Sequence, residues 1–322
     1  MNRKDGIRVI WMRGYMRISL IAWVIVLLTA CSSASPSLQS DRGIDPLQVT
    51  TTTGMIADIV SQIGQEHVKV TGLMGPGVDP HLYKASQGDI KKIDQAQIIF
   101  YNGLHLEGKM EEIFVKINKM KPVIAVSRDI DPQVLRYLGE GVTEVDPHIW
   151  FNVALWMQAT ETVRDALIEI DPSHTADYEA NTRAYLDELV LLDQSVREQI
   201  ARIPLAQRIL ITAHDAFGYF GDAYGLQVRG LQGMSTAGEF GSRDVIELRE
   251  FIIEKQVRAV FVESSVPQKS IEAVIQGAKK LGHQVVIGGD LYSDAMGPAD
   301  TSEGTYIGMV KHNVETIVNA LK

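Results

Sequence analysis

The chain repeats a rhythm of short apolar runs and longer amphipathic stretches, and this rhythm restricts its fold more than any other feature. In the first half, the short runs are rich in Val, Ile and Thr and predict strands at residues 47–52, 68–73, 98–101 and 122–126. The stretches between them have helical spacing and predict helices at residues 55–63, 86–95 and 108–119. Strands that alternate with helices form a parallel sheet that is covered by helices on both faces.

The same rhythm returns in the second half of the chain. It predicts strands at residues 208–212, 227–231, 259–262 and 284–287, and helices at residues 217–224, 243–255, 270–281 and 306–321. A weak internal repeat agrees, because Gly72-Leu73-Met74-Gly75 and Gly230-Leu231-Gln232-Gly233 each follow the second strand of their half. We therefore expect an α/β fold with two doubly wound parallel-sheet lobes.

One long α-helix is predicted to join these lobes. The stretch from Ser173 to Ile203 contains no Gly or Pro, Asp171-Pro172-Ser173 is a helix start signal, and Pro204 ends the helix. About 30 residues at about 1.5 Å each span roughly 45 Å, which is enough to reach both lobes. The expected boundaries are residues 46–172 for the N-terminal lobe, 173–204 for the linking helix and 205–322 for the C-terminal lobe. A single stiff helix should permit only a modest hinge motion.

The first 31 residues predict export and attachment to a membrane. Basic residues start the segment, and an apolar run from Ile18 to Leu28 follows, which is too short for a comfortable membrane-spanning helix. It leads into Leu28-Thr29-Ala30-Cys31, which resembles a bacterial lipobox, and Cys31 is the only cysteine of the chain. Residues 32–45 are rich in Ser, Pro, Gln and Asp and predict a flexible tether.

Four side chains far apart in the sequence each come after a predicted strand. His81 and His148 follow the second and fourth strands of the first half. His214 lies just past the strand that ends at residue 212, and Asp294 lies in the loop after the last strand. Ligands of doubly wound sheets bind beyond the carboxyl ends of the strands, so we expect all four at one rim. Three imidazoles and a carboxylate are suited to a divalent transition metal.

Residues beside the histidines are expected to hold them in place. His81 and His148 both stand in an Asp-Pro-His tripeptide, where proline fixes the backbone φ angle near −65°. Asp79, Asp146 and Asp215 are candidates for hydrogen-bond acceptors that orient the imidazoles.

Other residues compete for these roles. Asp290 competes with Asp294, since the sequence does not show which carboxylate turns inward. Glu263, at the end of a strand, is either a base beside the metal ligands or a buried helix-capping glutamate. His105 also follows a strand and is the nearest competitor among the other histidines.

Several other classes of protein lack support in this sequence. The chain has no phosphate loop, no nucleophile elbow and no dinucleotide fingerprint in a strand-helix context. A net charge of −9 and the absence of a Lys/Arg run after the signal segment argue against a nucleic-acid partner. Two alternatives stay open: a secreted zinc metalloenzyme that uses the same four residues, and a surface adhesin that a metal stabilises. Four protein ligands favour binding, because catalytic zinc sites keep one position open for water.

Five motifs in this order resemble one family, the TroA-like (cluster A-I) substrate-binding lipoproteins of ABC importers for manganese and zinc. The resemblance spans residues 47–322 and is greatest to the manganese-binding members of Gram-positive bacteria. The motifs are Leu73-Met74-Gly75-Pro76-Gly77-Val78-Asp79-Pro80-His81, Asn102-Gly103-Leu104-His105-Leu106-Glu107, Asp146-Pro147-His148-Ile149-Trp150-Phe151, Thr212-Ala213-His214-Asp215-Ala216-Phe217-Gly218-Tyr219-Phe220 and Tyr292-Ser293-Asp294-Ala295-Met296-Gly297.

The resemblance implies a receptor and not an enzyme. In the family, the positions that match His81, His148, His214 and Asp294 coordinate the metal. A monomer anchored by lipid on Cys31 to the outer face of the cell membrane would pass Mn²⁺ or Zn²⁺ to an ABC permease and its ATPase. No organic cofactor is expected.

The identity of the metal is only partly indicated by the resemblance. Many manganese members carry Glu where this chain has His214. Dedicated zinc members carry a long His-rich loop before the second ligand, whereas residues 127–144 contain no histidine. Mn²⁺ is therefore favoured, and Zn²⁺ stays an alternative.

We predict that the mature protein begins at Cys31 and carries lipid there, because the apolar segment ends at a lipobox-like site. Mass spectrometry of the N-terminal peptide of membrane-extracted protein would check this. An intact chain that starts at Met1, or cleavage elsewhere without acyl mass, would contradict it.

Overall fold

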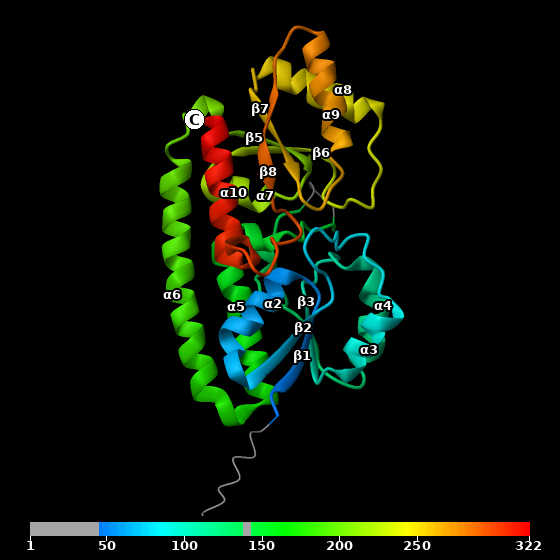
Figure 1. The fold of residues 1–322 in the computed structure, drawn as a ribbon, viewed down its shortest axis with the longest axis vertical. Helices are drawn as coiled ribbons and strands as arrows, with labels where there is room; N and C mark the ends of the chain where they lie inside the picture. Colours follow the sequence, from blue (N-terminus) through cyan, green and yellow to red (C-terminus); the bar gives the residue numbers. More distant parts are fainter. Residues whose placement is uncertain (1–44, 138–142) are drawn as a thin grey trace, which may run out of the picture. The chain divides into compact units, whose positions relative to one another are not determined.

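Residues 45–137 and 143–322 are described by a computed structural model of the chain (Figure 1). The predicted signal segment, Cys31 and all but the last residue of the predicted tether lie outside the described residues. Residues 46–322 belong to one structural unit. In the described part of the chain, no helix is both long enough and apolar enough to cross a membrane.

A four-stranded parallel sheet forms the first half of this unit. Its strand order is β2-β1-β3-β4, and in the central strand Val49 lies opposite Val70 on one side and Ile98 on the other. Each strand lies within one residue of its predicted bounds. The strands are β1 (Leu47–Thr51), β2 (Val68–Gly72), β3 (Ile98–Tyr101) and β4 (Val123–Ala125).

Helices cover both faces of this sheet, as the alternating pattern predicts. In Figure 1, α2 and α5 lie on one side of the strands and α3 and α4 on the other. The helices are α2 (Gly54–Gly64), α3 (Gln87–Gln95), α4 (Glu111–Ile117) and α5 (Val153–Ile170).

Helix α5 is absent from the sequence-based prediction. Its apolar residues do not form one narrow stripe, because the helix packs against α2 and against the long helix α6 (Thr175–Ile200), so more than one of its faces is buried. Its buried residues are Val153, Leu155, Trp156, Ala159, Thr160, Thr162, Val163, Ala166 and Leu167.

The second half contains two parallel strand pairs. Strand β5 (Ile209–His214) pairs with β6 (Gln227–Gln232), and β7 (Ala259–Glu263) pairs with β8 (Val286–Leu291). The predicted α/β fold class is confirmed. However, the two pairs form separate two-stranded sheets, because β5 and β7 lie next to each other without a ladder of hydrogen bonds between them. At this boundary the backbone N–H of His214 donates to the Glu263 side chain at 2.8 Å. The flanking helices are α7 (Gly218–Tyr224), α8 (Ser242–Glu254), α9 (Lys269–Lys280) and α10 (Tyr306–Leu321).

Strand β8 begins two residues later than predicted and ends four residues later. The pair Gly288-Gly289 suggests a turn in the sequence, yet it lies inside the strand. A Cβ atom on Gly288 would lie 2.8 Å from Ala320 of α10 and 2.9 Å from Phe261 of β7. Glycine is therefore needed here for the close approach of helix and strands, and not for a turn.

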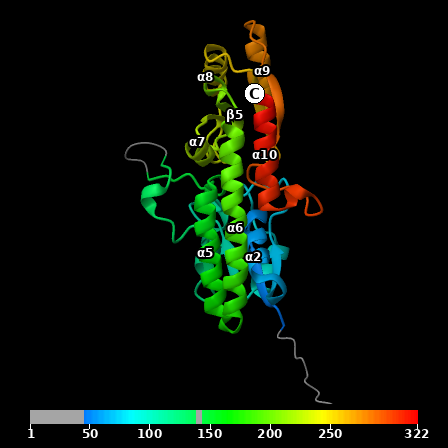
Figure 2. The ribbon, with the colours of Figure 1, turned by 90° about the vertical axis from the view of Figure 1, so that its left-hand side faces the viewer.

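The long helix α6 follows a 3₁₀ turn at Pro172–His174, close to where the sequence predicts it. Its 26 residues span about 39 Å. It is not a free-standing rod, because α2, α5 and α10 pack along it (Figures 1 and 2). One hydrophobic cluster runs from Val49 in β1 through Leu189 in α6 to Val314 in α10, so both halves share a core. The lobe boundaries expected from the sequence stay a prediction.

A buried carboxyl group lies under the loop that follows β3. Glu107 is 2% exposed, and its Oε1 accepts hydrogen bonds from Thr52 Oγ1 at 2.6 Å and from Asn102 N at 2.8 Å. Burial raises its pKa from 4.5 to about 7, although these hydrogen bonds act in the opposite direction.

A carboxyl group with a raised pKa in the folded state stabilises the protein below its unfolded pKa and loses this contribution as the pH rises through the folded value. Between pH 4.5 and 7, Glu107 should therefore lower the free energy of unfolding of the metal-free protein by about 3 kcal/mol. Urea titrations across this range should show a flatter pH profile for Glu107→Gln than for the natural protein. The exposed Glu112→Gln is the matched control, and equal profiles for both variants would refute the assignment.

Candidate metal centre

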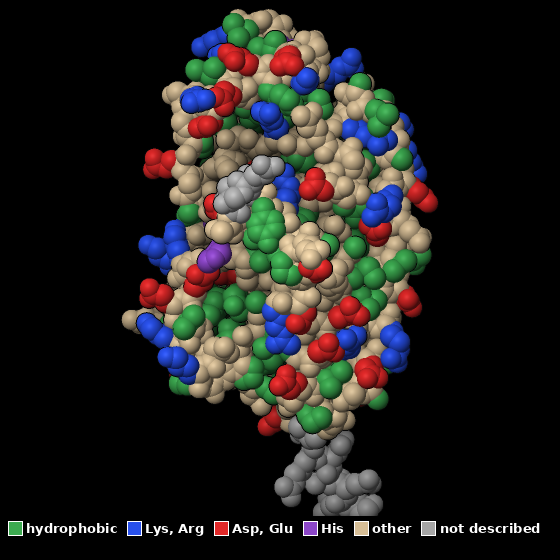
Figure 3. All heavy atoms as spheres, turned by 180° about the vertical axis from the view of Figure 1, so that it is seen from behind, with side chains coloured by type: hydrophobic (Ala, Val, Ile, Leu, Met, Phe, Trp, Pro, Cys, Tyr) green, Lys and Arg blue, Asp and Glu red, His purple; other side chains and the backbone are tan. Residues whose placement is uncertain are grey.

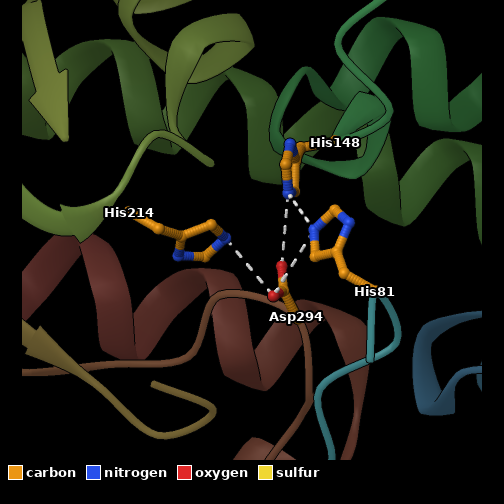
Figure 4. Close-up of side chains that lie close together, drawn as sticks. All are labelled: His81, His148, His214 and Asp294. Atoms are coloured by element: carbon orange, nitrogen blue, oxygen red, sulfur yellow. Dashed lines mark hydrogen bonds and ion pairs between the residues drawn. The ribbon is translucent and has the colours of Figure 1, made fainter. Parts of the chain in front are cut away.

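The structure brings His81, His148, His214 and Asp294 together (Figure 4). His81 lies in the loop after β2, and His148 immediately precedes the 3₁₀ turn Ile149–Phe151. His214 is the last residue of β5, and Asp294 comes three residues after β8. One potential ligand atom from each residue lies within 4.8 Å of the other three.

The side chains point their ligand atoms at a common centre (Figure 4). The Nε2 atoms of His81 and His148 are 3.3 Å apart. Asp294 Oδ1 lies 3.4 Å from His148 Nε2, while Oδ2 lies 3.3 Å from His214 Nε2 and 3.9 Å from His81 Nε2. Two ligands of a tetrahedral ion with bonds of about 2.1 Å are about 3.4 Å apart, so these spacings fit a metal ion.

The cluster is almost completely shielded from solvent. His148 and His214 are 0% exposed, Asp294 is 1% exposed and His81 is 5% exposed. Within the described residues, the two carboxylate oxygens of Asp294 and the Nε2 atom of His214 have no hydrogen-bond partner. Unsatisfied buried polar atoms are unfavourable, and a cation at the centre would satisfy all three at once.

Carboxylates fix the orientation of two of the imidazoles. Asp146 Oδ1 lies 2.7 Å from His148 Nδ1 and also accepts the backbone N–H of His148 at 3.0 Å. Glu263 Oε2 lies 2.5 Å from His214 Nδ1. Both contacts leave Nε2 as the ligand atom, which is the usual arrangement of histidines that bind a metal. Glu263 therefore contacts both the ring and the backbone of His214. Its role as a base beside the metal ligands stays a prediction.

The loop that carries His81 is held by hydrogen bonds from both halves of the chain. Asp79 Oδ1 accepts the backbone N–H of His81 at 2.9 Å, and Asp79 Oδ2 accepts from Thr236 Oγ1 at 2.5 Å. Near the end of the loop, Asp89 Oδ2 accepts from Tyr83 OH at 2.8 Å and from Ser86 N at 2.9 Å. Asp79 thus orients the backbone, and not the imidazole ring as predicted.

The loop that carries Asp294 is held in place by two residues that are distant in the sequence. Trp150 Nε1 donates to the carbonyl of Ser293 at 3.0 Å, and the same indole packs edge-on against His148 with ring centroids 5.1 Å apart. Asn313 of α10 is 2% exposed and bonds both backbone groups of Tyr292, at 2.9 and 2.7 Å. No sequence motif singles out Asn313 for this role.

The structure also places two competing residues, Asp290 and His105, and one expected acceptor, Asp215. Asp290 lies within β8 with its side chain exposed, so Asp294 is the carboxylate that turns inward. The side chain of His105 is 81% exposed and lies outside the cluster. Asp215 was expected to accept from an imidazole, but within the described residues its Oδ1 has no hydrogen-bond partner. Its carboxylate instead lies in the field of Arg136, which bonds Asp146 Oδ2 at 3.3 Å.

The charges inside the cluster are strongly coupled. Burial lowers the pKa of His81 to about 4. Burial also opposes charge on His148 and His214, but their carboxylate partners prevail and raise the pKa of His148 to about 9 and that of His214 well above its usual range. The pKa of Asp294 is held low by His214 and His148 against the effect of burial. The site is therefore built to hold positive charge around Asp294.

The outer surface differs from this centre. On the face seen in Figure 3, acidic and basic side chains are interspersed, and no broad basic patch is visible. This agrees with the net charge of −9 in giving no support to nucleic-acid binding.

Similar proteins cover almost the whole chain. The manganese-binding lipoprotein MntA of Bacillus subtilis (strain 168) is 51% identical over 310 residues, which cover 95% of this chain and 100% of that protein. The zinc-binding protein TroA of Treponema pallidum (strain Nichols) is 47% identical over 305 residues, which cover 95% of this chain and 98% of that protein.

The fold and the family agree with these similarities. The solved structure of the periplasmic zinc-binding protein TroA from Treponema pallidum matches with a TM-score of 0.84 and 49% identity, covering 86% of this chain and 99% of that one. The resemblance inferred from the sequence motifs is thus confirmed. Residues 49–320 match the ZnuA family, described as the zinc-uptake complex component A, periplasmic, and the chain belongs to that family.

Proposed function

We propose that this protein captures a divalent transition metal with His81, His148, His214 and Asp294 and delivers it to an ABC importer outside the cytoplasm. The observation that carries the proposal is the pair of Asp294 oxygens, which are buried among three imidazoles without a hydrogen-bond partner in the described residues. The protein would be a monomer held at the membrane by lipid on Cys31, and an ABC permease with its ATPase would receive the metal.

The names of the relatives support transport and not catalysis. They are manganese-binding, zinc-binding or metal ABC transporter substrate-binding proteins, including the PsaA lipoprotein of Streptococcus anginosus. The alternative of a secreted metalloenzyme has no such support, and four converging protein ligands favour retention over hydrolysis. No observation favours a metal-stabilised adhesin.

Mn²⁺ is the favoured cargo and Zn²⁺ is the alternative. Both Asp294 oxygens lie within 3.4 Å of an imidazole Nε2 atom, which supports a bidentate carboxylate and five donor atoms in total. Structural zinc sites are almost always four-coordinate, so a larger donor set suits manganese better. Nevertheless, a given set of nitrogen and oxygen ligands intrinsically binds Zn²⁺ more tightly than Mn²⁺. Competitive titration with both ions and elemental analysis of protein from its native membrane would decide between them.

Replacing His81, His148 or His214 by Ala should weaken Mn²⁺ and Zn²⁺ affinity at least about tenfold, because each change removes a ligand from a closed site. Titration calorimetry measures the affinity, and thermal unfolding of the metal-free variants checks that the fold is retained. The matched control is His67→Ala, which removes a partly exposed imidazole bonded to Asp177 outside the cluster.

The same variants test delivery in cells. Uptake of the metal should fall with His214→Ala and stay unchanged with His67→Ala in cells whose only copy of the protein is the variant. Unchanged affinity of all three ligand variants would refute the metal site. Normal uptake by cells without the protein would refute the importer role alone.

Metal affinity should decrease as the pH falls, because protons compete for the same imidazole nitrogens. In the metal-free protein the pKa of His148 is about 9 and that of His214 is raised as well, so metal binding near neutral pH must displace protons. Affinity should therefore rise with pH through neutrality and level off only above about 9. Calorimetry in buffers of different ionisation enthalpy counts the protons released. A constant affinity from about pH 6 to 9 would be the contrary result.

A further inference from the structure

A metal ion must pass through the protein surface to reach the buried cluster. His81 has the largest exposed fraction of the four candidate ligands, at 5%. It lines a small cavity of about 30 Å³ that also takes in His105 and residues from both halves of the chain. This volume is enough for about two water-sized particles. Residues around the cavity include His81, His105, Glu144, Pro147, Met234 and Ser235.

His105 has the arrangement of a metal-binding histidine at the outer side of this cavity. Its side chain is 81% exposed, and its Nδ1 lies 2.5 Å from Glu111 Oε1. The same contact between Nδ1 and a carboxylate orients His148 and His214 in the cluster. In all three residues, the carboxylate leaves Nε2 available as a ligand atom.

The backbone that presents His105 is strained. Gly103, Leu104 and His105 have φ angles of 83°, 54° and 64°. Such angles are uncommon for residues other than glycine and are more unfavourable for Leu than for His. The next two residues, Leu106 and Glu107, are 0% and 2% exposed and anchor the loop in the core. Strained conformations persist where the surrounding structure enforces them, and they gather at binding sites. Here the strain turns an imidazole outward beside an opening that leads to His81.

We propose that His105, supported by Glu111, is a docking ligand that binds the incoming divalent cation transiently and passes it across the cavity to His81. This inference rests on the proposed function, since it assigns a route to the same site. His105 Nε2 would replace one water of the hydrated ion, and His81 Nε2 would then replace His105. Only ligand exchange is involved: the first replacement releases one water, the second releases the His105 imidazole, and the oxidation state of the ion does not change. The negative charges of Glu111 and Glu144 attract cations to this position.

A transient ligand has a signature that a final ligand lacks. Because His105 is not bound to the metal in the end state, its loss leaves the free energy of the bound state unchanged. Its loss raises the barrier for both directions of exchange, so the association and dissociation rates should fall by the same factor. Loss of a final ligand would mainly raise the dissociation constant instead.

The variants are chosen to separate metal binding from backbone strain. Asn and Asp both tolerate the left-handed conformation of residue 105 and are nearly equal in size. His105→Asn removes the metal-binding group, whereas His105→Asp supplies a carboxylate ligand in its place. His174→Asn is the matched control, because His174 Nδ1 also lies 2.6 Å from a carboxylate, Asp171, but His174 is outside the cavity.

Stopped-flow fluorescence can follow the exchange of Mn²⁺ and Zn²⁺. Trp150 packs against His148 and should report occupancy of the cluster. Association is measured by mixing with the free ion, dissociation by mixing with a chelator, and the equilibrium constant by competitive titration. Thermal unfolding of each metal-free variant shows whether the loop change alters stability.

We expect His105→Asn to slow association and dissociation about tenfold each, with an unchanged dissociation constant. His105→Asp should restore most of the rate, and His174→Asn should match the natural protein. Unchanged rates in His105→Asn would overturn the inference, and so would equal slowing in His105→Asn and His105→Asp, which would indicate a backbone effect. A dissociation constant raised tenfold would place His105 among the final ligands and also overturn it. If the natural protein binds neither ion, the proposed function fails instead.

Discussion

The structure depends on one unfavourable group, a carboxylate buried among three imidazoles. Asp294 is 1% exposed and has no hydrogen-bond partner among the described residues, so it must be neutralised by positive charge. Protons on His148 and His214 can supply this charge in the metal-free protein, and their raised pKa values reflect it. A divalent cation supplies it more completely and also satisfies the ligand atoms. The proposed binding would therefore exchange protons for metal at the same centre.

The fold assembles this centre from four separate chain segments. Each segment follows or ends a parallel strand except that of His148, which is fixed by Asp146 and Trp150. A hydrophobic core shared by both halves, with α6 and α10 along one side, holds these segments in register (Figures 1 and 2). Hydrogen bonds such as that from Thr236 to Asp79 join the two halves directly at the site. The four candidate ligands are thus held in place by the fold itself, which would limit the reorganisation that binding a metal requires.

Access to such a closed centre is a separate requirement from affinity. Burial that strengthens the interactions inside the cluster also slows the passage of a hydrated ion. An exposed imidazole at an adjoining cavity, held by its own carboxylate, offers a way to meet both requirements with different residues. His105 and His81 would then divide capture and retention between the outer and inner ends of one route.

The sequence by itself determined the α/β fold class, the long helix near 173–203 and the four residues that converge, because strand-helix periodicity and position after a strand are local signals. The sequence did not predict α5, because this helix is buried on several faces and lacks a single apolar stripe. The predicted β8 was too early, because Gly288-Gly289 suggests a turn, whereas in the fold Phe261 and α10 pack closely against these glycines. Only the tertiary structure decided between Asp294 and Asp290, placed Glu263 beside His214, and brought Asn313 and Thr236 to the site. These choices depend on distances between residues far apart in the chain, and no local pattern encodes such distances.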